Sequence, residues 1–268
     1  MSIVIEDFVK YHVDDNGILK SMENIGEEAR SVTIPHILHT GDAIEVLGKR
    51  FLKYQKFTEV IVSDEITKVE DEAFALTYVK KVKWSSGCKK ISAYCFRASE
   101  TQEISNIDHV TSICRGAFTV SSIRDFKWPT KCKKIPRSCF DSSMLRSITN
   151  MENVKTVGDT AFSACRLTTF AWPSCCPSIP ADCFRSSVLL KSVTNLENIQ
   201  SIGESAFSGT SIEEMDLSCS SMVCIAPNAF NGVNKDNIIL PYYLDKSMLV
   251  SNEQIDAYAA LQLSKIWK

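Results

Sequence analysis

The stretch VKTVGDTAFSACRLTTFAWP, residues 154–173, contains the whole repeating unit of this chain. Its landmarks are Val157, the small Ala161 directly before Phe162, and an alternating segment that ends at Trp172. Phenylalanine recurs at intervals of 22 or 23 residues on both sides of Phe162. The positions are Phe51, Phe74, Phe96, Phe118, Phe140, Phe162, Phe184, Phe207 and Phe230. A repeat this short cannot bury an apolar side alone, so we expect the copies to stack into a solenoid.

The neighbours of each phenylalanine also keep their character. A β-branched aliphatic residue stands five positions earlier in every copy. These residues are Val46, Val69, Ile91, Ile113, Ile135, Val157, Ile179, Ile202 and Ile225. The alternating segment after the phenylalanine predicts a β-strand. The segment around the phenylalanine is short and contains Gly, Ser and Pro, which predicts a helical or 3₁₀ turn. We therefore expect one continuous parallel sheet on one side of the solenoid and short turns on the other.

These residues resemble the BspA-like leucine-rich repeats. The family pattern is an isoleucine and a glycine, a few residues, Ala-Phe, a small residue or Cys, a Leu, and then Val-x-Ile-Pro. Residues 154–173 carry nearly every element, and the likeness covers residues 44–241, with Trp or Asn where the family has Ile before Pro. The resemblance implies a leucine-rich-repeat-like solenoid with a role in recognition or adhesion, because members are known mainly as bacterial and protist surface proteins that bind other proteins or matrix. It implies no shared active site.

A second period of about 44 residues overlies the first, because alternate copies end their strand differently. One type, the Trp-type coil, ends at Trp84, Trp128 or Trp172, and the other, the Asn-type coil, ends at Asn106, Asn150 or Asn195. Two interpretations stay open. Rings and amides alternate to fill the edge of the core, or the tryptophans form an exposed aromatic ladder for a ligand.

The two ends lack the regular spacing and predict three segments. Residues 1–43 are expected to form an N-terminal cap, in which Ser31–Pro35 resembles the strand of a first coil, and residues 44–241 form the solenoid. Residues 242–268 are expected to form a C-terminal cap. There a capping box at Ser251–Gln254 precedes apolar residues at helical spacing, which predicts an α-helix over the last coil. The alternative is that this helix docks a partner or a second copy.

Composition limits the function classes. The chain has 268 residues, 44% hydrophobic content and a net charge of −2, which indicates one globular repeat domain and argues against a nucleic-acid binder. No run of about 18 apolar residues predicts a transmembrane segment. The first ten residues carry no basic leader, so we expect no secretory signal. We expect a cytoplasmic protein if the N-terminus is native, and the family resemblance implies the alternative, the cell surface.

Eleven cysteines raise the question of disulfides or metal, but the repeat register favours core thiols. Six of them take slots held by Ala or aliphatic residues in other copies: Cys88, Cys95, Cys132, Cys139, Cys176 and Cys183. Equivalent cysteines are two coils apart, about 10 Å, beyond the limit of about 7 Å between the Cα atoms of a disulfide. His36 and His39 share a loop without a third ligand. We expect no metal and no cofactor.

No catalytic constellation stands out, so we expect no enzyme, and the exposed strand positions become the candidate site. In a solenoid the sheet face displays side chains at regular spacing. Here the outward positions run from basic to neutral to acidic along the chain, which favours an oriented protein ligand or the pairing of two copies. The candidate protein-binding residues are Lys81, Lys83, Glu103, Asp125, Lys127, Glu214 and Asp216.

A separate basic cluster is expected on the bend of the Trp-type coils. It comprises Lys89, Lys90, Lys131, Lys133 and Lys134. These lysines either meet phosphates or an acidic membrane surface, or serve solubility alone. Taken together, the sequence predicts a non-enzymatic protein-binding module that acts through its sheet face. The alternative is a structural or scaffold protein that acts through its C-terminal helix or by self-association.

Overall fold

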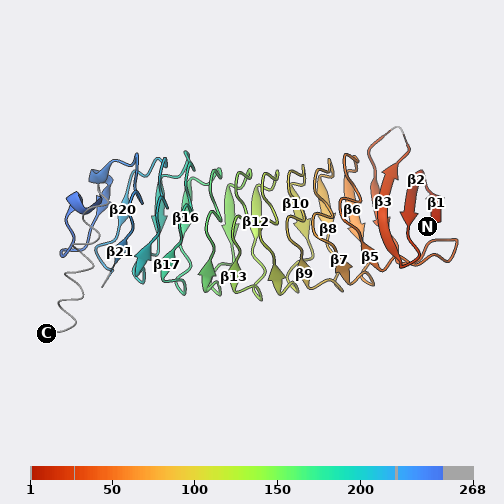
Figure 1. Cartoon of the computed structure of the whole chain (residues 1–268), viewed down its shortest axis with the longest axis horizontal. Coiled ribbons are helices and arrows are strands. Elements are labelled where there is room, and N and C mark those ends of the chain that lie inside the picture. The colour runs from red at the N-terminus through yellow and green to blue at the C-terminus, as the bar shows by residue number, and fades with distance from the viewer. Residues whose placement is uncertain (1, 27, 221–222, 250–268) are drawn as a thin grey trace.

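The computed structural model describes residues 2–26, 28–220 and 223–249, and these residues form an elongated solenoid (Figure 1). Its coils stack along one axis, from an N-terminal group of longer strands to the last described coil. A typical coil carries one long and one short strand. In the view of Figure 1 the long strands lie along the upper part of the solenoid and the short strands along the lower part. The predicted solenoid of parallel strands is therefore confirmed.

Two series of strands run through the array. The long strands, of which the last two are shortened, are β4 (Ser31–Ile34), β6 (Glu59–Val62), β8 (Lys81–Lys83), β10 (Glu103–Ser105), β12 (Asp125–Lys127), β14 (Ser147–Thr149), β16 (Thr169–Ala171), β18 (Ser192–Thr194), β20 (Met215–Asp216) and β22 (Ile238–Ile239). The short strands are β5 (Val46–Leu47), β7 (Lys68–Val69), β9 (Lys90–Ile91), β11 (Ser112–Ile113), β13 (Lys134–Ile135), β15 (Thr156–Val157), β17 (Ser178–Ile179), β19 (Ser201–Ile202) and β21 (Cys224–Ile225). The short strands occupy the side where the sequence predicted only turns.

Consecutive coils are joined alternately by the two series. The long pairs β8–β10, β12–β14 and β16–β18 alternate along the chain with the short pairs β9–β11, β13–β15 and β17–β19. Each of these long pairs joins a Trp-type coil to the next Asn-type coil. In the first of them the backbone N–H of Trp84 extends the ladder by donating to the Ser105 carbonyl at 3.0 Å. The Asn-type strand ends at a residue with positive φ, 60° at Asn106, which ends the extended backbone that further pairing needs.

This alternation confirms the period of about 44 residues. The prediction of one continuous sheet is wrong, because the described long strands divide into separate sheets, beginning with β10-β8-β6-β4 and followed by two-stranded pairs.

The turn around each phenylalanine is not helical, and the prediction of a helical or 3₁₀ turn is wrong. Left-handed residues flank the ring, as Glu72 (φ 61°) and Leu76 (φ 58°) flank Phe74. As a result alternate N–H groups point to the next coil: those of Glu72 and Phe74 donate to the Ala93 and Cys95 carbonyls, both at 2.9 Å. A helix would use these donors within its own coil. Helix in the described residues is limited to η1 (Lys235–Asn237) and η2 (Lys246–Leu249).

The phenylalanines form a continuous stack through the core. From Phe74 to Phe230 adjacent rings lie stacked with centroids 5.0 to 5.8 Å apart. Trp84, Trp128 and Trp172 are fully buried beside this stack. Each indole N–H donates to the carbonyl four residues later, at 2.7 to 2.9 Å, so its polar group is satisfied without solvent. The core interpretation of the tryptophans is confirmed, and the exposed aromatic ladder is wrong.

The first coil departs by one residue from the predicted register. Leu47, not Val46, pairs with Val69. The backbone contacts also place Leu52, not Phe51, opposite Phe74, because Arg50 and Tyr54 donate to Glu72 and Leu76. Phe51 is still buried and packs edge-on against Phe74 at 5.1 Å. Phe51 borders the N-terminal strands instead of another coil, because the Met22 N–H donates to the Phe51 carbonyl. The position directly before the core residue therefore accepts a ring here, where later coils hold Ala or Cys.

The N-terminal residues form an antiparallel meander at the end of the solenoid. Its strands are β1 (Ser2–Glu6), β2 (Val9–Val13) and β3 (Ile18–Asn24), and β3 pairs in parallel with β5. The strand predicted within Ser31–Pro35 is present as β4. The helix predicted after Ser251 lies outside the described residues. The boundaries of the three segments stay predictions.

The described cysteines are all free thiols, and most are buried. Burial raises the pKa of Cys132 to about 11 and that of Cys165 to about 12. Cys139 and Cys183 are completely enclosed, and burial raises the pKa of each well above its usual range. The core position predicted for the six cysteines in the repeat slots is confirmed.

Thiol labelling checks this arrangement. In native protein at pH 7.5 or so, N-ethylmaleimide is expected to modify Cys175, Cys219 and Cys224 quickly, because only these three are fully exposed. The buried thiols react only after unfolding, since reagent and hydroxide must reach them to form the reactive thiolate. Peptide mass spectrometry over a time course gives the order of reaction. Modification of Cys139 as fast as Cys175 would contradict the buried register.

Candidate binding surface

The long strands display their outward side chains in two rows that run along the solenoid. Side chains alternate along each three-residue strand, so the central residue points into the core and the two outer residues point to solvent. In β8, Val82 is buried and Lys81 and Lys83 are exposed. All seven candidate residues lie on this face and are exposed. Parallel pairing in register sets Lys81 beside Glu103 and Asp125 beside Ser147. The structure thus brings Lys81, Lys83 and Glu103 together, and it places the candidates of β12 and β20 farther along the same face.

Much of the charge in the first half of this face is paired. Lys81 Nζ lies 3.0 Å from a Glu103 carboxylate oxygen, and this hydrogen bond raises the pKa of Lys81 above its usual value. Lys127 Nζ lies 3.4 Å from Asp108. Asp125 accepts a hydrogen bond from the Ser147 hydroxyl at 2.6 Å. Exposed pairs of this kind add little stability, but they neutralise the local field. The basic end of the expected gradient is therefore weaker than the sequence suggests.

The middle of the face carries small polar side chains. On β14, β16 and β18 the outward residues are Ser147, Thr149, Thr169, Ala171, Ser192 and Thr194. Five of them present hydroxyl groups close to the backbone, Ala171 presents a methyl group, and none is charged. A surface without long side chains lets a partner approach closely and loses little side-chain entropy on binding.

Towards its C-terminal end the face contains an acidic hollow, where the ladder is interrupted. Between β18 and β20 only a single bridge, Ser192 to Glu214, remains. A hollow of about 350 Å³ opens there, with Glu197, Glu214, Asp216 and Cys219 in its lining. The Ser218 hydroxyl and N–H hold the pKa of Asp216 below its usual value, so its carboxylate is charged at neutral pH. None of the three acidic residues forms an ion pair with another described residue. This end therefore keeps a negative field suited to a cationic group.

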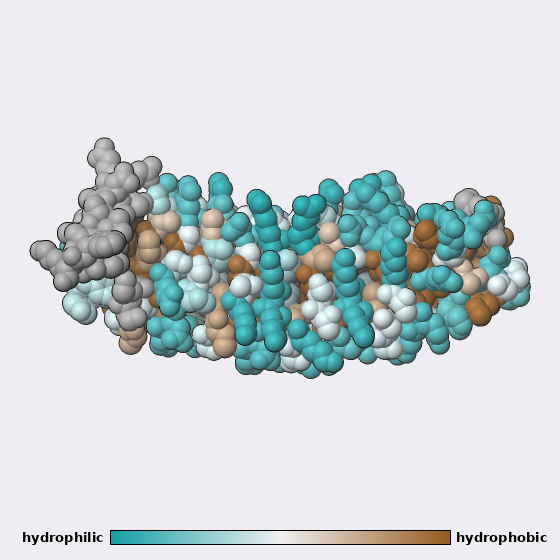
Figure 2. All heavy atoms as spheres, turned by 60° about the horizontal axis from the view of Figure 1, so that its bottom comes forward, coloured by the Kyte–Doolittle hydropathy of each residue, from teal (hydrophilic) through white to brown (hydrophobic). Residues whose placement is uncertain are grey.

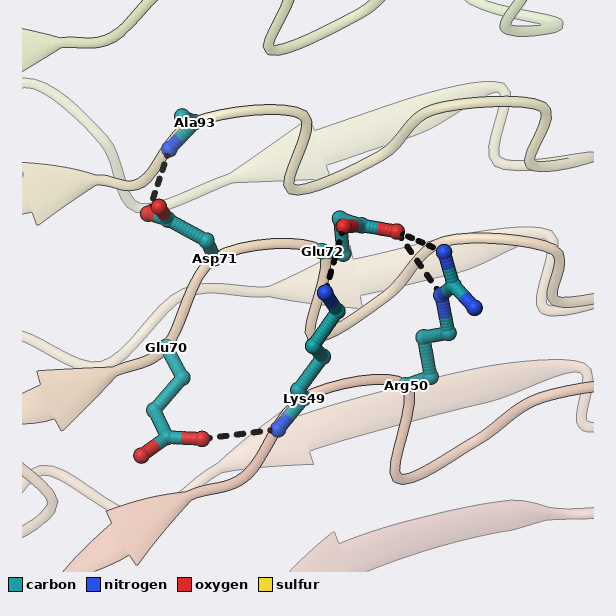
Figure 3. Close-up of polar contacts among 6 residues, drawn as sticks. All are labelled: Lys49, Arg50, Glu70, Asp71, Glu72 and Ala93. Carbon is teal, nitrogen blue, oxygen red and sulfur yellow. Dashed lines mark hydrogen bonds and ion pairs between the residues drawn. The ribbon is translucent and has the colours of Figure 1, made fainter.

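Another charged group joins three successive coils beside the short strands (Figure 3). Glu72 receives Lys49 Nζ on one carboxylate oxygen at 2.8 Å and Arg50 Nε on the other at 2.7 Å. Glu70 accepts the Lys49 backbone N–H at 3.0 Å, and Asp71 accepts the Ala93 backbone N–H at 3.0 Å. Each carboxylate thus crosses from one coil to the next. The group fastens neighbouring coils to each other, and its charges are already satisfied.

The stability that Glu72 adds is expected to depend on pH. The pKa of Glu72 lies below the usual 4.5, mainly because Lys49 donates a hydrogen bond to its carboxylate and also because Arg50 does. Its contribution is therefore complete above about pH 5 and disappears as the pH falls through the lowered value. We expect Glu72→Gln to cost about 1 kcal/mol at pH 7 and nearly nothing at pH 3. Urea unfolding at both pH values measures this. An equal loss at both would show that packing, not charge, gives Glu72 its role.

The described histidines do not converge on a metal site. His36 Nδ1 lies 3.6 Å from Glu65, whereas His39 hydrogen-bonds Glu6. His109 Nε2 lies 3.2 Å from the Cys88 carbonyl. Within the part of the chain that the structure describes, no three His, Cys, Asp or Glu side chains are grouped to hold a metal ion. Nor does any helix in those residues have the length and apolar character needed to cross a membrane.

Sequence reasoning missed the acidic hollow and the short-strand face. Glu197 follows Asn195 by two residues, and Glu152 and Asp108 stand at the same place after Asn150 and Asn106. This recurrence was the available signal for an acidic residue beside the strand end. The hollow itself depends on the interrupted ladder at β20, which no pattern in the sequence indicates.

Comparisons with known proteins agree with this geometry. The family model of the BspA type leucine rich repeat region matches residues 45–168 and 155–249, with six copies. A leucine-rich repeat protein from Bacteroides ovatus has a similar structure, with a TM-score of 0.63 and 15% identity over 92% of this chain and 70% of that one. A leucine rich cell surface protein from Faecalibacterium prausnitzii is 16% identical over 87% of this chain and 86% of that one, with a TM-score of 0.47. No curated protein matches the sequence.

The family model covers most of the chain and spans the same coils that the phenylalanine spacing defines. Leucine-rich repeats of this type are typical of protein-binding and surface adhesion proteins, and the resemblance seen in residues 154–173 is confirmed. This chain belongs to the family of BspA-type leucine-rich repeat proteins.

Proposed function

We propose that this chain is a non-enzymatic protein-binding module that recognises a protein through the long-strand face. One observation carries the proposal: an uncharged hydroxyl-bearing surface on β14, β16 and β18 leads directly into the unpaired acidic hollow beside β20. Such a face offers close contact along the strands and one charged end that fixes orientation. The partner's basic segment lies over Glu197, Glu214 and Asp216. The charges around Lys81 and Lys127 then contribute less, because they are already paired.

The test compares the two faces of the same two coils. In the face variant, Thr169→Arg and Thr194→Arg place long cationic side chains on β16 and β18. In the matched control, Thr156→Arg and Ser178→Arg place the same side chains on β15 and β17, which are exposed on the short-strand side. A protein recovered with the native chain from cell and surface extracts is identified, and its Kd is measured for all three proteins after equal thermal stability is shown.

We expect the face variant to bind at least about tenfold more weakly, because the new side chains hold the partner off the strands, while the control binds like the native chain. Charge reversal by Glu214→Lys and Asp216→Lys is expected to slow association and to make it less sensitive to salt. Equal binding by the face variant and the native chain would overturn the assignment. A loss in the control alone would move the site to the short strands.

The family context supports the cell surface as the place where this module acts, and the cytoplasm is the alternative. Labelling intact source cells with an antibody to the chain separates the two. Signal on intact cells supports surface recognition or adhesion, and signal only after permeabilisation excludes it.

A further inference from the structure

The short-strand face carries charge of a different kind from the long-strand face. Seven cationic residues gather on the three neighbouring coils of Phe96, Phe118 and Phe140, here called the basic patch. They are Lys89, Lys90, Arg115, Lys131, Lys133, Lys134 and Arg137, and all are exposed. Segments 88–94, 110–116 and 131–138, which supply them, contain no Asp or Glu. Figure 2 brings the lower margin of Figure 1 forward and shows hydrophilic side chains along the middle of the solenoid.

The patch is held in register by the backbone. Lys90 stands in β9, which pairs with β11, and Lys134 stands in β13. Arg115 and Arg137 lie one coil apart, since the Gly116 N–H donates to the Arg137 carbonyl at 3.0 Å. Neighbouring coils are separated by about 5 Å, so the first and third coils of the patch are about 10 Å apart. Lys90 and Lys134 therefore stand in strands, and Arg115 and Arg137 stand in turns whose backbone is hydrogen-bonded to a neighbouring coil.

The patch is not neutralised by the protein. None of its seven side chains forms an ion pair within the described residues, whereas Lys80, Lys81, Lys127 and Lys191 on the long-strand side are all paired. Seven unpaired cations within three coils repel one another in the free protein. In a chain whose net charge is −2, such a concentration of one sign is a local feature that general solubility does not require.

Acidic residues border the patch in the row of its arginines and at the bends. In the row that contains Arg115 and Arg137, Ala93 stands one coil before Arg115, Asp71 stands two coils before it, and Asp159 stands one coil after Arg137. The bends that lead into the neighbouring short strands carry Asp108 and Glu152, which are exposed. Lys68 and Lys155, which are exposed one coil before and one coil after, continue the rows of Lys90 and Lys133. The positive area is thus a narrow strip that runs along the solenoid between these acidic residues.

We propose that the basic patch binds an anionic polysaccharide, a narrow polymer whose sulfate or carboxylate groups lie across the three coils. The strip matches a single extended chain, and lysines act as point charges that need no fixed geometry. Thr111 and Ser112, on the coil between the two lysine pairs, are exposed. The Thr111 hydroxyl donates to the Lys89 carbonyl at 3.3 Å and can accept a hydrogen bond from a sugar hydroxyl, as the Ser112 hydroxyl can.

Other polyanions fit less well. Recognition of single-stranded nucleic acid relies on aromatic platforms for the bases. The Tyr94 ring beside the patch is already covered by the Arg115 guanidinium, which lies 5.6 Å from the ring centroid. A lipid bilayer is broader than the strip and would press its anionic headgroups against Asp71, Asp108 and Asp159. The large hydrophobic residues that are exposed in the described chain lie outside the three patch segments, so no anchor for a membrane is present there.

The test uses the whole chain and a heparin-derived octasaccharide as the probe, titrated by calorimetry at 50 and 200 mM salt. The patch variant combines Lys89→Gln, Lys90→Ser, Lys133→Gln and Lys134→Ser. Gln200 and Ser201 hold the equivalent positions in a later coil, so the solenoid accommodates these residues. The control variant combines Lys81→Thr, Lys83→Ala, Lys127→Ala and Lys191→Thr, which removes the same charge from the other face. Circular dichroism confirms equal folding.

We expect the native chain and the control to bind the octasaccharide alike, and the patch variant to bind at least about tenfold more weakly with a flatter salt dependence. Neutral dextran is expected not to bind. Equal weakening of both variants would show a net-charge effect and overturn the site. Tighter binding of a 20-nucleotide oligo-dT, or of vesicles rich in anionic phospholipid, would overturn the choice of ligand. The protein partner of the long-strand face is tested by other variants, so failure of one proposal leaves the other standing.

Discussion

Replacing Phe140 by alanine is expected to lower the free energy of unfolding by about 3–5 kcal/mol. Phe140 lies at the centre of the array, fully buried, with stacked rings on both sides: Phe118 at 5.1 Å and Phe162 at 5.8 Å. Phe126 and Trp128 contact it from the strand side at 5.3 and 6.3 Å. Backbone ladders on both edges of the coil prevent these neighbours from closing the space, so most of the cavity remains. Urea unfolding followed by tryptophan fluorescence measures the loss.

The matched control is Phe140→Leu, because Leu52 already fills the same slot in the first coil. We expect this variant to lose only about 1 kcal/mol, since leucine keeps most of the apolar volume. An alanine variant no less stable than the leucine variant would mean that the ring stack is not the main source of cohesion between coils.

Gly158→Ala is expected to destabilise the protein by about 3 kcal/mol, although it adds a single methyl group. A Cβ at this position would lie 2.5 Å from the Arg137 backbone nitrogen and 2.9 Å from the Arg137 Cα. The clash is with backbone, which cannot rotate aside. The Gly158 N–H also donates to the Ile135 carbonyl at 2.9 Å, so moving the coil outward breaks the bond that holds it. Thermal unfolding and urea unfolding both report the change.

Gly209→Ser serves as its control. Gly209 has a φ of 71°, but a Cβ there would meet nothing closer than 3.7 Å. Ser142 and Ser186 occupy the equivalent position in other coils with φ of 57° and 58°. The cost should be limited to the left-handed backbone, about 1 kcal/mol. A larger loss at Gly209 than at Gly158 would show that backbone conformation, and not the close approach of coils, controls the use of glycine here.

The sequence was sufficient for the architecture because each coil repeats the same packing problem. A phenylalanine every 22 residues and a strand with period two leave few arrangements other than a parallel stack. The alternation of Trp128 with Asn150 indicated paired coils, and it is expressed as alternate long and short strand pairs.

The errors arose where neighbouring coils, and not local preference, decide the backbone. Leu76 and Val120 adopt positive φ, 58° in both, which their own preferences oppose, because the N–H groups then reach the next coil. No composition rule identifies such residues in a single sequence. The first coil shifted by one residue for a similar reason, since Phe51 meets the N-terminal strands and not another coil.

The candidate face was predictable in position but not in charge. The alternation of inward and outward residues along the strands was enough to predict that Lys81, Lys127 and Asp216 are exposed. Their net effect depends on pairs formed between coils, such as Lys81 with Glu103, which stand 22 residues apart in the sequence. Residues one period apart are neighbours in a stacked solenoid, so the pairing of Lys81 with Glu103 could have been predicted from the sequence. The pairing of Lys127 with Asp108 could not, because it depends on the course of a bend.

The central claim is that a protein partner lies on the long-strand face, and site-directed photocross-linking tests it most directly. A benzoylphenylalanine replaces Thr169 on β16 in one protein and Thr156 on β15 of the same coil in another. Both are exposed threonines, so reactivity and stability are matched. We predict a strong cross-link to the partner from position 169 and little from position 156. Cross-linking that is equal at both positions, or stronger at 156, would contradict the account.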